Sequence, residues 1–493
     1  MTGWRWVLPS FADVFFLVFL IILAFTPLSA GLLGDADTGW HIRTGEQIIA
    51  SHAVPRTDPF SYTMQGEPWY AWEWLYDLAI AAVHHVAGLN GVVFVTATII
   101  SLTFALLFHL ILLRCRNLAV ASVLTLLAAA SAQVHMLARP HVLSWLLALL
   151  WVECLLRFAE GRYAALLGLP MLMLVWVNVH AGWVLGLAVM AIFAVEPALK
   201  KDRRALCWLG AVLPGCLAAT LLTPYGYRLP MHVFQYLSDS FLMNSIDEFQ
   251  SPNFHQPVYL YFAAFVPLGL VGALAARERL TLTHSLLWLC SLYAGLYAAR
   301  NIPLAVVLMS MVLGPPLASV LAQIRPLRVV QEISNSMAML DCRLRGHALA
   351  IALTASCGLL VLHGGRLFSR PLMHHHFDQR TYPVSAAGFI AQKGIHDHLF
   401  TSDSWGAYLI YRLYPATKVY FDDRHDFYGT AFVKEYGTAV SGARLWQQPL
   451  ARHKVQWVLM PVDAALSSLL RNDSNWRPVY DDGVAILFTR KPL

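Results

Sequence analysis

The sequence predicts a mostly α-helical, polytopic membrane protein of about 11–13 transmembrane helices, followed by a soluble C-terminal α/β domain. Hydrophobic residues make up 58% of the 493 residues and charged residues only 13%, about half of the charged share in a soluble domain. The third observation is a change after about residue 364, where long apolar runs give way to short runs of mixed polarity. We therefore expect a transmembrane domain over 1–363 and an extracytoplasmic domain over 364–493.

Eleven apolar runs are long enough to cross a bilayer as helices. Cytoplasmic loops are enriched in Lys and Arg, and one alternating set of connections carries these residues, so we expect that set on the inner side of the membrane. The runs lie at about 12–31, 90–113, 118–134, 140–158, 163–179, 183–198, 206–223, 257–276, 280–299, 302–323 and 347–363. The inner set is Arg5, Arg114 with Arg116, Arg157 with Arg162, Lys200 to Arg204, Arg277 with Arg279, and the connector Arg325 to Arg345.

The first outer loop, 32–89, contains a predicted helix from Thr38 to Ala50 and a second apolar stretch, Trp74 to Ala87. If this second stretch crossed the membrane, the alternation of basic loops would fail, so we predict a juxtamembrane helix or a partial insertion. The competing interpretation makes it a span and leaves Arg114 and Arg116 outside. The remaining outer segments are 135–140, 180–182, 224–256, 300–301 and everything after 364.

In the C-terminal segment, short β-rich runs predict strands and amphipathic runs predict helices. The predicted strands are Lys418 to Phe421, Trp457 to Met460 and Ala485 to Phe488, and the predicted helices are Ala386 to Gln392 and Trp405 to Leu413. At roughly 130 residues the segment is long enough to fold as a domain.

Charge and cysteine content exclude some classes of function. The net charge of +6 comes from basic residues in short loops, which indicates topology and no nucleic-acid partner. None of the seven cysteines falls in the first outer loop or after residue 357. The exposed portions are therefore expected to carry no disulfide and no cysteine-ligated metal.

Asp35 and Asp37 follow the first apolar run directly. Carboxylates are costly at a membrane face and usually have a function there. In an extended segment the side chains of residues i and i+2 point the same way, and such a pair can deprotonate a hydroxyl or hold a divalent cation. The alternative is that an Asp caps the helix that follows.

The same loop contains His41 and Glu73, the latter among Trp69, Tyr70, Trp72 and Trp74. Glu73 is a candidate metal ligand or acid–base group, with a surface-helix carboxylate as the alternative. The aromatic residues are typical of an interfacial belt, although one or two could stack on a sugar ring.

Other outer span ends contain Arg139, Arg300, Asn178 and His180. The two arginines suit a phosphate-bearing substrate, and the alternative is snorkelling to lipid head groups. A lone His such as His180 is more often a packing residue than a ligand. The charged stretch Asp422 to Asp426 follows a predicted strand. It could contact a substrate, but after a strand a charged turn is the commoner case.

These features resemble the C-type glycosyltransferase (GT-C) superfamily, polytopic enzymes that take a sugar from a polyprenyl-phosphate carrier on the outer membrane face. An Asp follows the first span, then a helix, Val54-Pro55-Arg56, Gly66 to Trp69 and Glu73. The spacing is similar to that of the bacterial lipid A aminoarabinose transferases, whose functional Asp falls on Asp37 and whose metal-binding Glu falls on Glu73. The start Asp35 to Trp40 differs from those enzymes, so their lipid A acceptor is not carried over.

The stretches Trp176 to His180 and Phe421 to Arg424 are similar to bacterial GT-C proteins of unassigned substrate. The resemblance implies an inverting transfer to a lipid, glycan or protein acceptor, with membrane lipids as surroundings. Asp37 would then be the general base, oriented by Asp35. Arg139 and Arg300 would bind the carrier phosphate, and a divalent metal is an optional cofactor.

Three alternatives remain. An oligosaccharyl- or protein-glycosyltransferase could use the same scaffold and move a whole glycan. A transporter or flippase of lipid-linked substrates normally needs ionisable residues near the midplane of the membrane, and the apolar runs hold few of them. A catalytically inactive scaffold that organises partners is the third.

Overall fold

The computed structural model describes residues 7–276, 280–344, 346–368, 370–396 and 398–491. Its contacts divide the chain into two compact units, each built from separate stretches of sequence. Unit 1 comprises Met1–Ser29, Val93–Pro230 and Asn244–Met373, and unit 2 comprises Ala30–Val92, Met231–Met243 and His374–Leu493. Arg5, Arg277, Arg279 and Arg345 of the predicted inner set lie outside the described residues.

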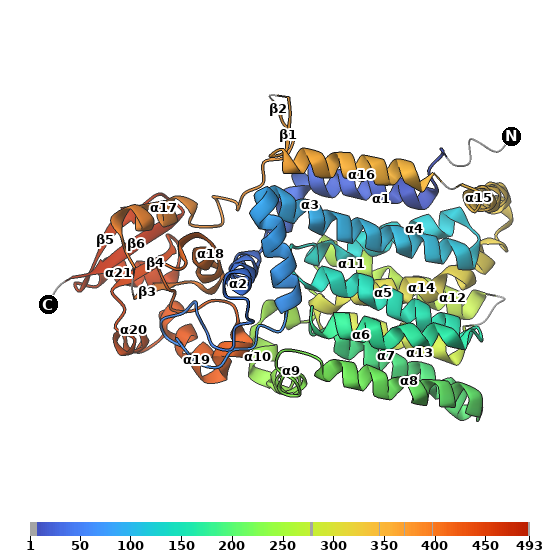
Figure 1. The fold of residues 1–493 in the computed structure, drawn as a ribbon, viewed down its shortest axis with the longest axis horizontal. Coiled ribbons are helices and arrows are strands. Elements are labelled where there is room, and N and C mark those ends of the chain that lie inside the picture. The colour runs from blue at the N-terminus through green and yellow to red at the C-terminus, as the bar shows by residue number, and fades with distance from the viewer. Residues whose placement is uncertain (1–6, 277–279, 345, 369, 397, 492–493) are drawn as a thin grey trace. The chain divides into compact units, whose positions relative to one another are not determined.

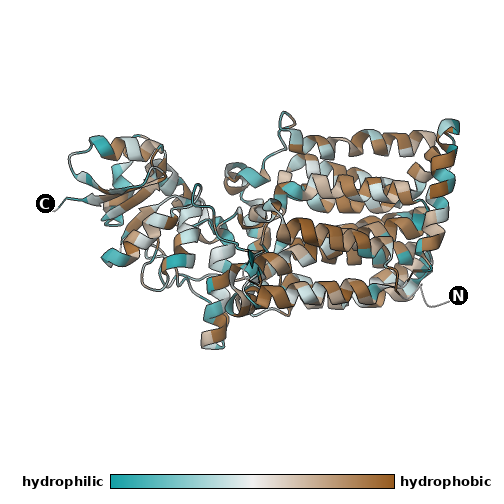
Figure 2. Ribbon diagram, turned by 90° about the horizontal axis from the view of Figure 1, so that it is seen from above, coloured by the Kyte–Doolittle hydropathy of each residue, from teal (hydrophilic) through white to brown (hydrophobic). Residues whose placement is uncertain are grey.

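Unit 1 is a helical bundle, and hydrophobic residues dominate its helices in Figure 2. The long helices lie side by side along most of their length (Figure 1), and α13 and α4 both pack against α14. Its helices are α1 (Phe11–Phe25), the second part of α3 (Trp74–Cys115), α4 (Leu118–Ala132), η3 (Gln133–His135), α5 (His141–Ala159), η4 (Tyr163–Gly168), α6 (Leu169–Val177), α7 (Trp183–Leu199), α8 (Arg203–Leu221), η5 (Asp247–Phe249), α11 (Pro257–Ala263), α12 (Phe265–Ala275), α13 (Leu282–Tyr297), η6 (Ala299–Asn301), α14 (Ile302–Leu321), η7 (Arg325–Leu327), α15 (Arg328–Asp341) and α16 (His347–Leu362). A small hairpin, β1 (Arg366–Leu367) and β2 (Arg370–Pro371), follows α16.

The chain is an integral membrane protein of the predicted helical class, and each of the eleven predicted runs falls on one helix or on consecutive helices. Within the described residues, six helices are long and apolar enough to cross a membrane. A seventh is counted if α1 and η2 (Pro27–Leu33), which bend by 75° at their junction, form one span. The segments Tyr163–Val177, Trp183–Leu199 and His347–Leu362 are shorter apolar helices. Hydropathy alone does not register such bends and short helices, which is why more runs than full-length helices are found.

Helix α3 is interrupted at Gly88, whose φ of 58° and ψ of −155° are not helical. A positive φ is readily adopted by glycine, because it has no Cβ. Residues 74–87 therefore form a helical segment separate from the span that follows, as expected for the predicted Trp74 to Ala87 helix. Its depth in the bilayer stays a prediction.

Unit 2 is an α/β unit with a four-stranded sheet of order β3-β4-β6-β5, in which β3 and β4 are parallel and the other pairs antiparallel. Its strands are β3 (Leu399–Thr401), β4 (Trp457–Pro461), β5 (Trp476–Asp481) and β6 (Ala485–Arg490). Its helices are α2 (Asp37–Ser51), the first part of α3, α17 (Val384–Lys393), α18 (Asp403–Leu413), α19 (His425–Val440), α20 (Gln447–Arg452) and α21 (Ala465–Asn472). Two further helices, α9 (Arg228–Ser238) and α10 (Ser240–Ser245), each have residues in both units.

Two predicted strands and both predicted helices of the C-terminal segment are confirmed, whereas Lys418 to Phe421 is not a strand. Val419 makes only isolated bridges, to Leu399 and to Ser61 of the first outer loop. The segment therefore lies between β3 and a loop that is distant in sequence, and Val419, Tyr420 and Phe421 are all fully buried without forming a continuous strand.

The hydrophobic core of unit 2 combines the first outer loop with the C-terminal segment. Trp40, Phe60 and Trp69 share one buried cluster with Tyr408 and Leu487. The structure therefore groups residues 30–92 with the C-terminal segment, whereas the sequence analysis placed loop 32–89 in a domain over 1–363. Apolar residues of a long loop need a partner surface, and here the α/β segment supplies it.

Candidate functional site

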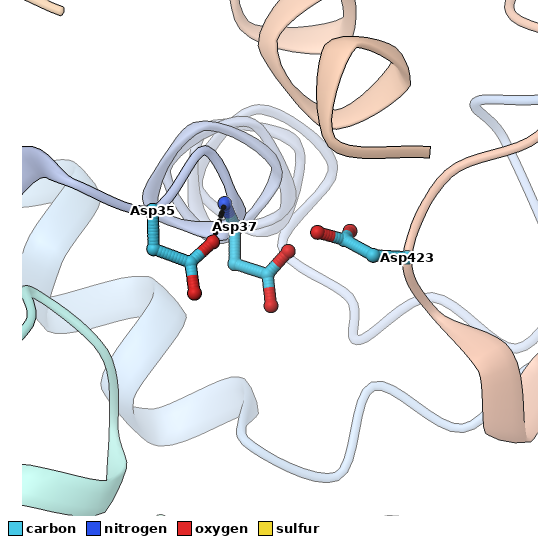
Figure 3. Close-up of side chains that lie close together, drawn as sticks. All are labelled: Asp35, Asp37 and Asp423. Atoms are coloured by element: carbon cyan, nitrogen blue, oxygen red, sulfur yellow. Dashed lines mark hydrogen bonds between the residues drawn. The ribbon is translucent and has the colours of Figure 1, made fainter. Parts of the chain in front are cut away.

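Three carboxylates of unit 2 lie together, Asp35 and Asp37 at the start of α2 and Asp423 from the turn before α19 (Figure 3). One ligand atom from each lies within 4.8 Å of the others, and Asp37 is only 4% exposed. Like charges at this range repel strongly away from water. A proton or a cation bound to the cluster would reduce this repulsion, so the cluster is a candidate metal site.

Asp35 contacts the start of α2, and its role in catalysis or in cation binding stays a prediction. Its Oδ1 accepts a hydrogen bond of 2.9 Å from the backbone N–H of Asp37, the first residue of α2, while the N-cap position of the helix is Ala36. The residue between them, Ala36, has α-helical φ and ψ. A turn, and not the extended segment that we expected, brings the two carboxylates to one side.

Asp423 belongs to the charged stretch Asp422 to Asp426, which the sequence analysis weighed as a charged turn or a substrate contact without choosing Asp423 as a site residue. Burial, and then the charge of Asp37 and its hydrogen bond, raise the pKa of Asp423 well above its ordinary value, with further contributions from Asp35 and Asp422. A carboxyl group with a raised pKa keeps its proton unless a cation replaces it. Three carboxylates form a hard-oxygen ligand set of the kind that Mg²⁺, Mn²⁺ or Ca²⁺ prefers, so the residues fit a divalent metal.

Arg424 fixes the turn that carries Asp423. Its guanidinium lies 2.8 Å from Asp58 of the first outer loop and 2.7 Å from Asp422, and it sits 4.6 Å from the ring centroid of Trp69. Arg424 is 3% exposed, and a buried charge is tolerated when it is paired and hydrogen-bonded. The charged turn that the sequence predicts is present, and its Asp422 and Arg424 are buried in an ion-pair network.

His41 and Glu73 lie in a second buried group of unit 2. His41 Nδ1 is 2.6 Å from Asp77 Oδ1, and His41 Nε2 is 3.9 Å from Glu73 Oε2. His41 and Asp37 are four residues apart on α2 and therefore share one face of that helix. In the part of the chain that the structure describes, the candidate metal group is the Asp35, Asp37 and Asp423 cluster, and Glu73 is not a member of it.

Unit 1 contains a cationic cluster at the ends of its helices. Arg300 lies 3.1 Å and Arg139 lies 3.9 Å from the carboxylate of Glu248 in η5, and His135 is 4.0 Å away. Burial by itself would raise the pKa of Glu248, but Arg300 and then Arg139 outweigh it and hold that pKa well below the usual range. Glu248 is therefore an anion bound between two guanidinium groups.

His180 belongs to the same cluster in a neutral form. Burial, and then Arg300 and Arg139, lower the pKa of His180 to about 3. The backbone N–H of Gly182 donates to His180 Nδ1 at 3.0 Å, and Ser144 Oγ lies 2.8 Å from the same atom. Because Nδ1 is an acceptor, the ring proton is on Nε2, and His180 offers an uncharged N–H donor.

The side chain of Asn178 forms hydrogen bonds with backbone carbonyl groups. Its side-chain amide donates to the carbonyl oxygens of Leu174 at 2.9 Å and Leu222 at 3.1 Å, and the residue is 5% exposed. It thus ties the end of α6 to the end of α8, two residues before His180.

The predicted residues are divided between the two units, with the Asp35 and Asp37 pair and the His41 and Glu73 pair in unit 2, and Arg139, Arg300, Asn178 and His180 in unit 1. The sequence analysis did not single out Glu248, and it considered Asp423 and Arg424 only as members of a charged stretch. The available signals were the run Phe421 to Arg424, which carries three charges after an apolar stretch, and the acidic pair within the outer segment 224–256.

Comparisons with known proteins support the fold. No protein-family model matches the chain, and no curated protein matches it. The crystal structure of the Archaeoglobus fulgidus oligosaccharyltransferase, in the apo form and tethered to an acceptor peptide, is similar with a TM-score of 0.57 at 12% identity, over 92% of this chain and 69% of that one. Crystal structures of ArnT from Cupriavidus metallidurans are similar over 96% of this chain and 97% of that one. The apo state has a TM-score of 0.52 at 13% identity, and the state bound to undecaprenyl phosphate has 0.51 at 14%.

Proposed function

Because the chain has the fold of the GT-C membrane transferases, we propose that it is a membrane glycosyltransferase. It moves a sugar from a polyprenyl-phosphate carrier to a lipid, glycan or protein acceptor, with inversion at the anomeric carbon. The reaction takes place at the outer face of a bacterial cytoplasmic membrane, where the positive-inside pattern puts the C-terminal segment.

The observation that carries this proposal is the buried carboxylate cluster around Asp37. Asp37 takes the proton from the acceptor hydroxyl, and the resulting oxygen forms a bond to the anomeric carbon of the donor. The bond between that carbon and the phosphate oxygen breaks, and the carrier phosphate leaves with the electron pair. A base that is held in one position contributes typically 10²–10⁴-fold to the rate.

Asp35 and Asp423 keep Asp37 in place. The hydrogen bond from the Asp37 N–H to Asp35 orients the start of α2. Burial and the charge of Asp37 raise the pKa of Asp423. A single proton shared by these two carboxylates leaves the pair able to accept a second proton, and we assign that role to Asp37. Asp35, Asp37 and Asp423 are the residues that would hold a divalent cation, and such an ion would supply Lewis-acid stabilisation of negative charge.

The carrier phosphate is bound by the cationic cluster of unit 1. Arg139 and Arg300 offer guanidinium groups, which match phosphate oxygens in geometry and charge. His180 adds a neutral Nε2–H donor whose protonation does not change near neutral pH. Donors that are already oriented stabilise the charge that grows on the leaving phosphate.

The test compares the wild-type protein in nanodiscs with Asp37→Asn, using a panel of radiolabelled polyprenyl-phosphate sugars and following the loss of label from the lipid. The variant keeps the shape of the side chain but cannot act as a base, so we expect a loss of about 10²–10⁴-fold in transfer. Glu67→Gln is the matched control, because it neutralises an exposed carboxylate of the same loop.

Full transfer by a correctly folded Asp37→Asn protein contradicts the role of Asp37. Turnover only with lipid-linked oligosaccharides points to an oligosaccharyltransferase on the same scaffold. Absence of turnover with every donor, at intact folding, overturns the proposed activity. Repeating the wild-type reaction after chelation, with and without added Mn²⁺ or Mg²⁺, shows whether the carboxylates work with a cation or with a proton.

A further inference from the structure

Glu248 occupies the position in unit 1 that an anionic ligand of the two arginines would take. Its Oε1 is 3.1 Å from Arg300, and its Oε2 is 3.9 Å from Arg139 and 4.0 Å from His135. The cluster is only partly covered, since the side chains of Arg139, Glu248 and Arg300 are 22%, 24% and 26% exposed. An outside ligand can therefore reach these arginines, but it meets a carboxylate already bound there.

The two residues after Glu248 also contact Arg300 or its neighbour Ala299. The guanidinium of Arg300 lies 4.2 Å from the ring centroid of Phe249. The backbone N–H of Ala299 donates to the carbonyl of Gln250 at 2.9 Å. Three consecutive residues, 248–250, thus contact the start of η6. Release of Glu248 from Arg300 would loosen the whole short segment.

We propose that Glu248 is an internal competitor of the carrier phosphate: its carboxylate holds Arg139 and Arg300 while no carrier is bound, and it returns to displace the phosphate after transfer. This inference rests on the proposed function, because that function assigns the two arginines to the carrier. It adds the residue that regulates access to them.

The carrier occurs as the sugar-bearing donor and as the released phosphate, and the charge of each form determines how strongly Glu248 competes with it. The donor is a sugar phosphodiester with a single negative charge, whereas the released carrier is a phosphate monoester with a charge near −2 at neutral pH. Coulomb repulsion by the carboxylate scales with the charge of the ligand. Glu248 therefore opposes the product more than the donor and speeds product release.

The first experiment measures binding of undecaprenyl phosphate to wild-type protein and to Glu248→Gln in nanodiscs. Removing the competing charge should tighten the binding of undecaprenyl phosphate at least about tenfold. For a singly charged phosphodiester of the same lipid we expect about threefold, because the repulsion scales with the charge of the ligand. In turnover assays the variant should show stronger inhibition by added undecaprenyl phosphate. Phosphatidic acid is a parallel probe, and tightening for both lipids assigns the competition to lipid phosphate monoesters in general.

Asp247→Asn is the matched control, since it removes the same charge from the neighbouring exposed residue of η5. Equal tightening by both variants would mean a general field effect and would overturn the proposal. Unchanged or weaker binding by Glu248→Gln would overturn it too, because Glu248 would then organise the arginines for the ligand. Sugar transfer by the wild type in the same nanodiscs separates this failure from failure of the proposed function.

A second measurement needs no substitution and covers the case in which Glu248→Gln folds poorly. Undecaprenyl phosphate added to the wild type should speed hydrogen exchange at the Gln250 and Ala299 amides, whose bonds are to Asp247 and Gln250. Slower exchange at these amides on ligand binding would show that the segment closes over the ligand, and would refute displacement.

Discussion

His180 illustrates how a single side chain is held in one protonation state by its surroundings. It is partly buried next to two arginines, and these together lower its pKa to about 3. Its Nδ1 is already occupied as an acceptor for the Gly182 N–H. The sequence analysis weighed a packing residue against a substrate ligand, and the geometry allows both, since Nδ1 serves the fold while Nε2–H is the donor.

This environment predicts a dependence of stability on pH. The folded-state pKa of about 3 lies below the ordinary value of 6.5, so between these values the unfolded chain binds more protons. The contribution of neutral His180 to the free energy of unfolding is thus complete above pH 6.5. It is lost as pH falls, by at most about 1.4 kcal/mol per pH unit. We expect His180→Asn to flatten the fall in melting temperature from pH 7 to pH 5.

The matched control is His255→Asn, which removes an exposed histidine of the outer segment 224–256. Glu248, whose pKa is lowered, loses its contribution only as pH falls below its ordinary value of 4.5, which the chosen window avoids. An identical pH profile for wild type and His180→Asn would show that the histidine is not held neutral.

Among the elements of unit 2, α2 packs closely against the first part of α3, which carries Asp77. The predicted helix Thr38 to Ala50 is confirmed as α2, but its contact surface was not apparent from the sequence. A Cβ placed on Gly45 would lie 1.9 Å from the carbonyl oxygen of Asp77 and 2.5 Å from the Cβ of Ala81. Glycine is therefore required for close packing of the two helices.

Gly45→Ala should force these helices apart. Overpacking of this kind costs typically 1–3 kcal/mol, and the same shift would disturb the His41–Asp77 contact one turn away. We expect a lower melting temperature together with reduced sugar transfer. Gly388→Ala in α17 is the control, because its Cβ meets nothing within 4 Å and alanine favours a helix. A Gly45→Ala protein as stable and active as wild type would contradict this packing argument.

At the scale of the whole molecule, the units do not follow the order of the chain. Residues 30–92 share a core with the C-terminal segment, and Arg424 pairs with Asp58 across more than 300 positions of sequence. The carboxylate cluster depends on this arrangement, because Asp35 and Asp37 come from one stretch and Asp423 from the other.

Removal of residues 374–493 should therefore affect the first outer loop. Trp40, Phe60 and Trp69 would lose their buried partners, and burial of such side chains is worth roughly 1.5–3 kcal/mol each. We expect proteolytic cleavage within 52–70 in the shortened protein at a protease concentration that leaves the full chain intact, and no sugar transfer. Equal resistance of the loop in both proteins would show that residues 30–92 fold without the C-terminal segment.

The residues read along the chain were enough to predict the membrane class, the positions of the apolar helices and the α/β character of the C-terminal segment, and to choose Asp35 and Asp37 as candidate site residues. These features depend on local composition, hydropathy and spacing, which a single stretch of chain contains. Only the tertiary structure decided that Asp423 joins these carboxylates, that Asp422 and Arg424 are buried, and that Glu248 lies between Arg139 and Arg300. Each of these depends on a contact between residues far apart in the chain, where burial and neighbouring charge, rather than residue type, set the chemistry of the side chain.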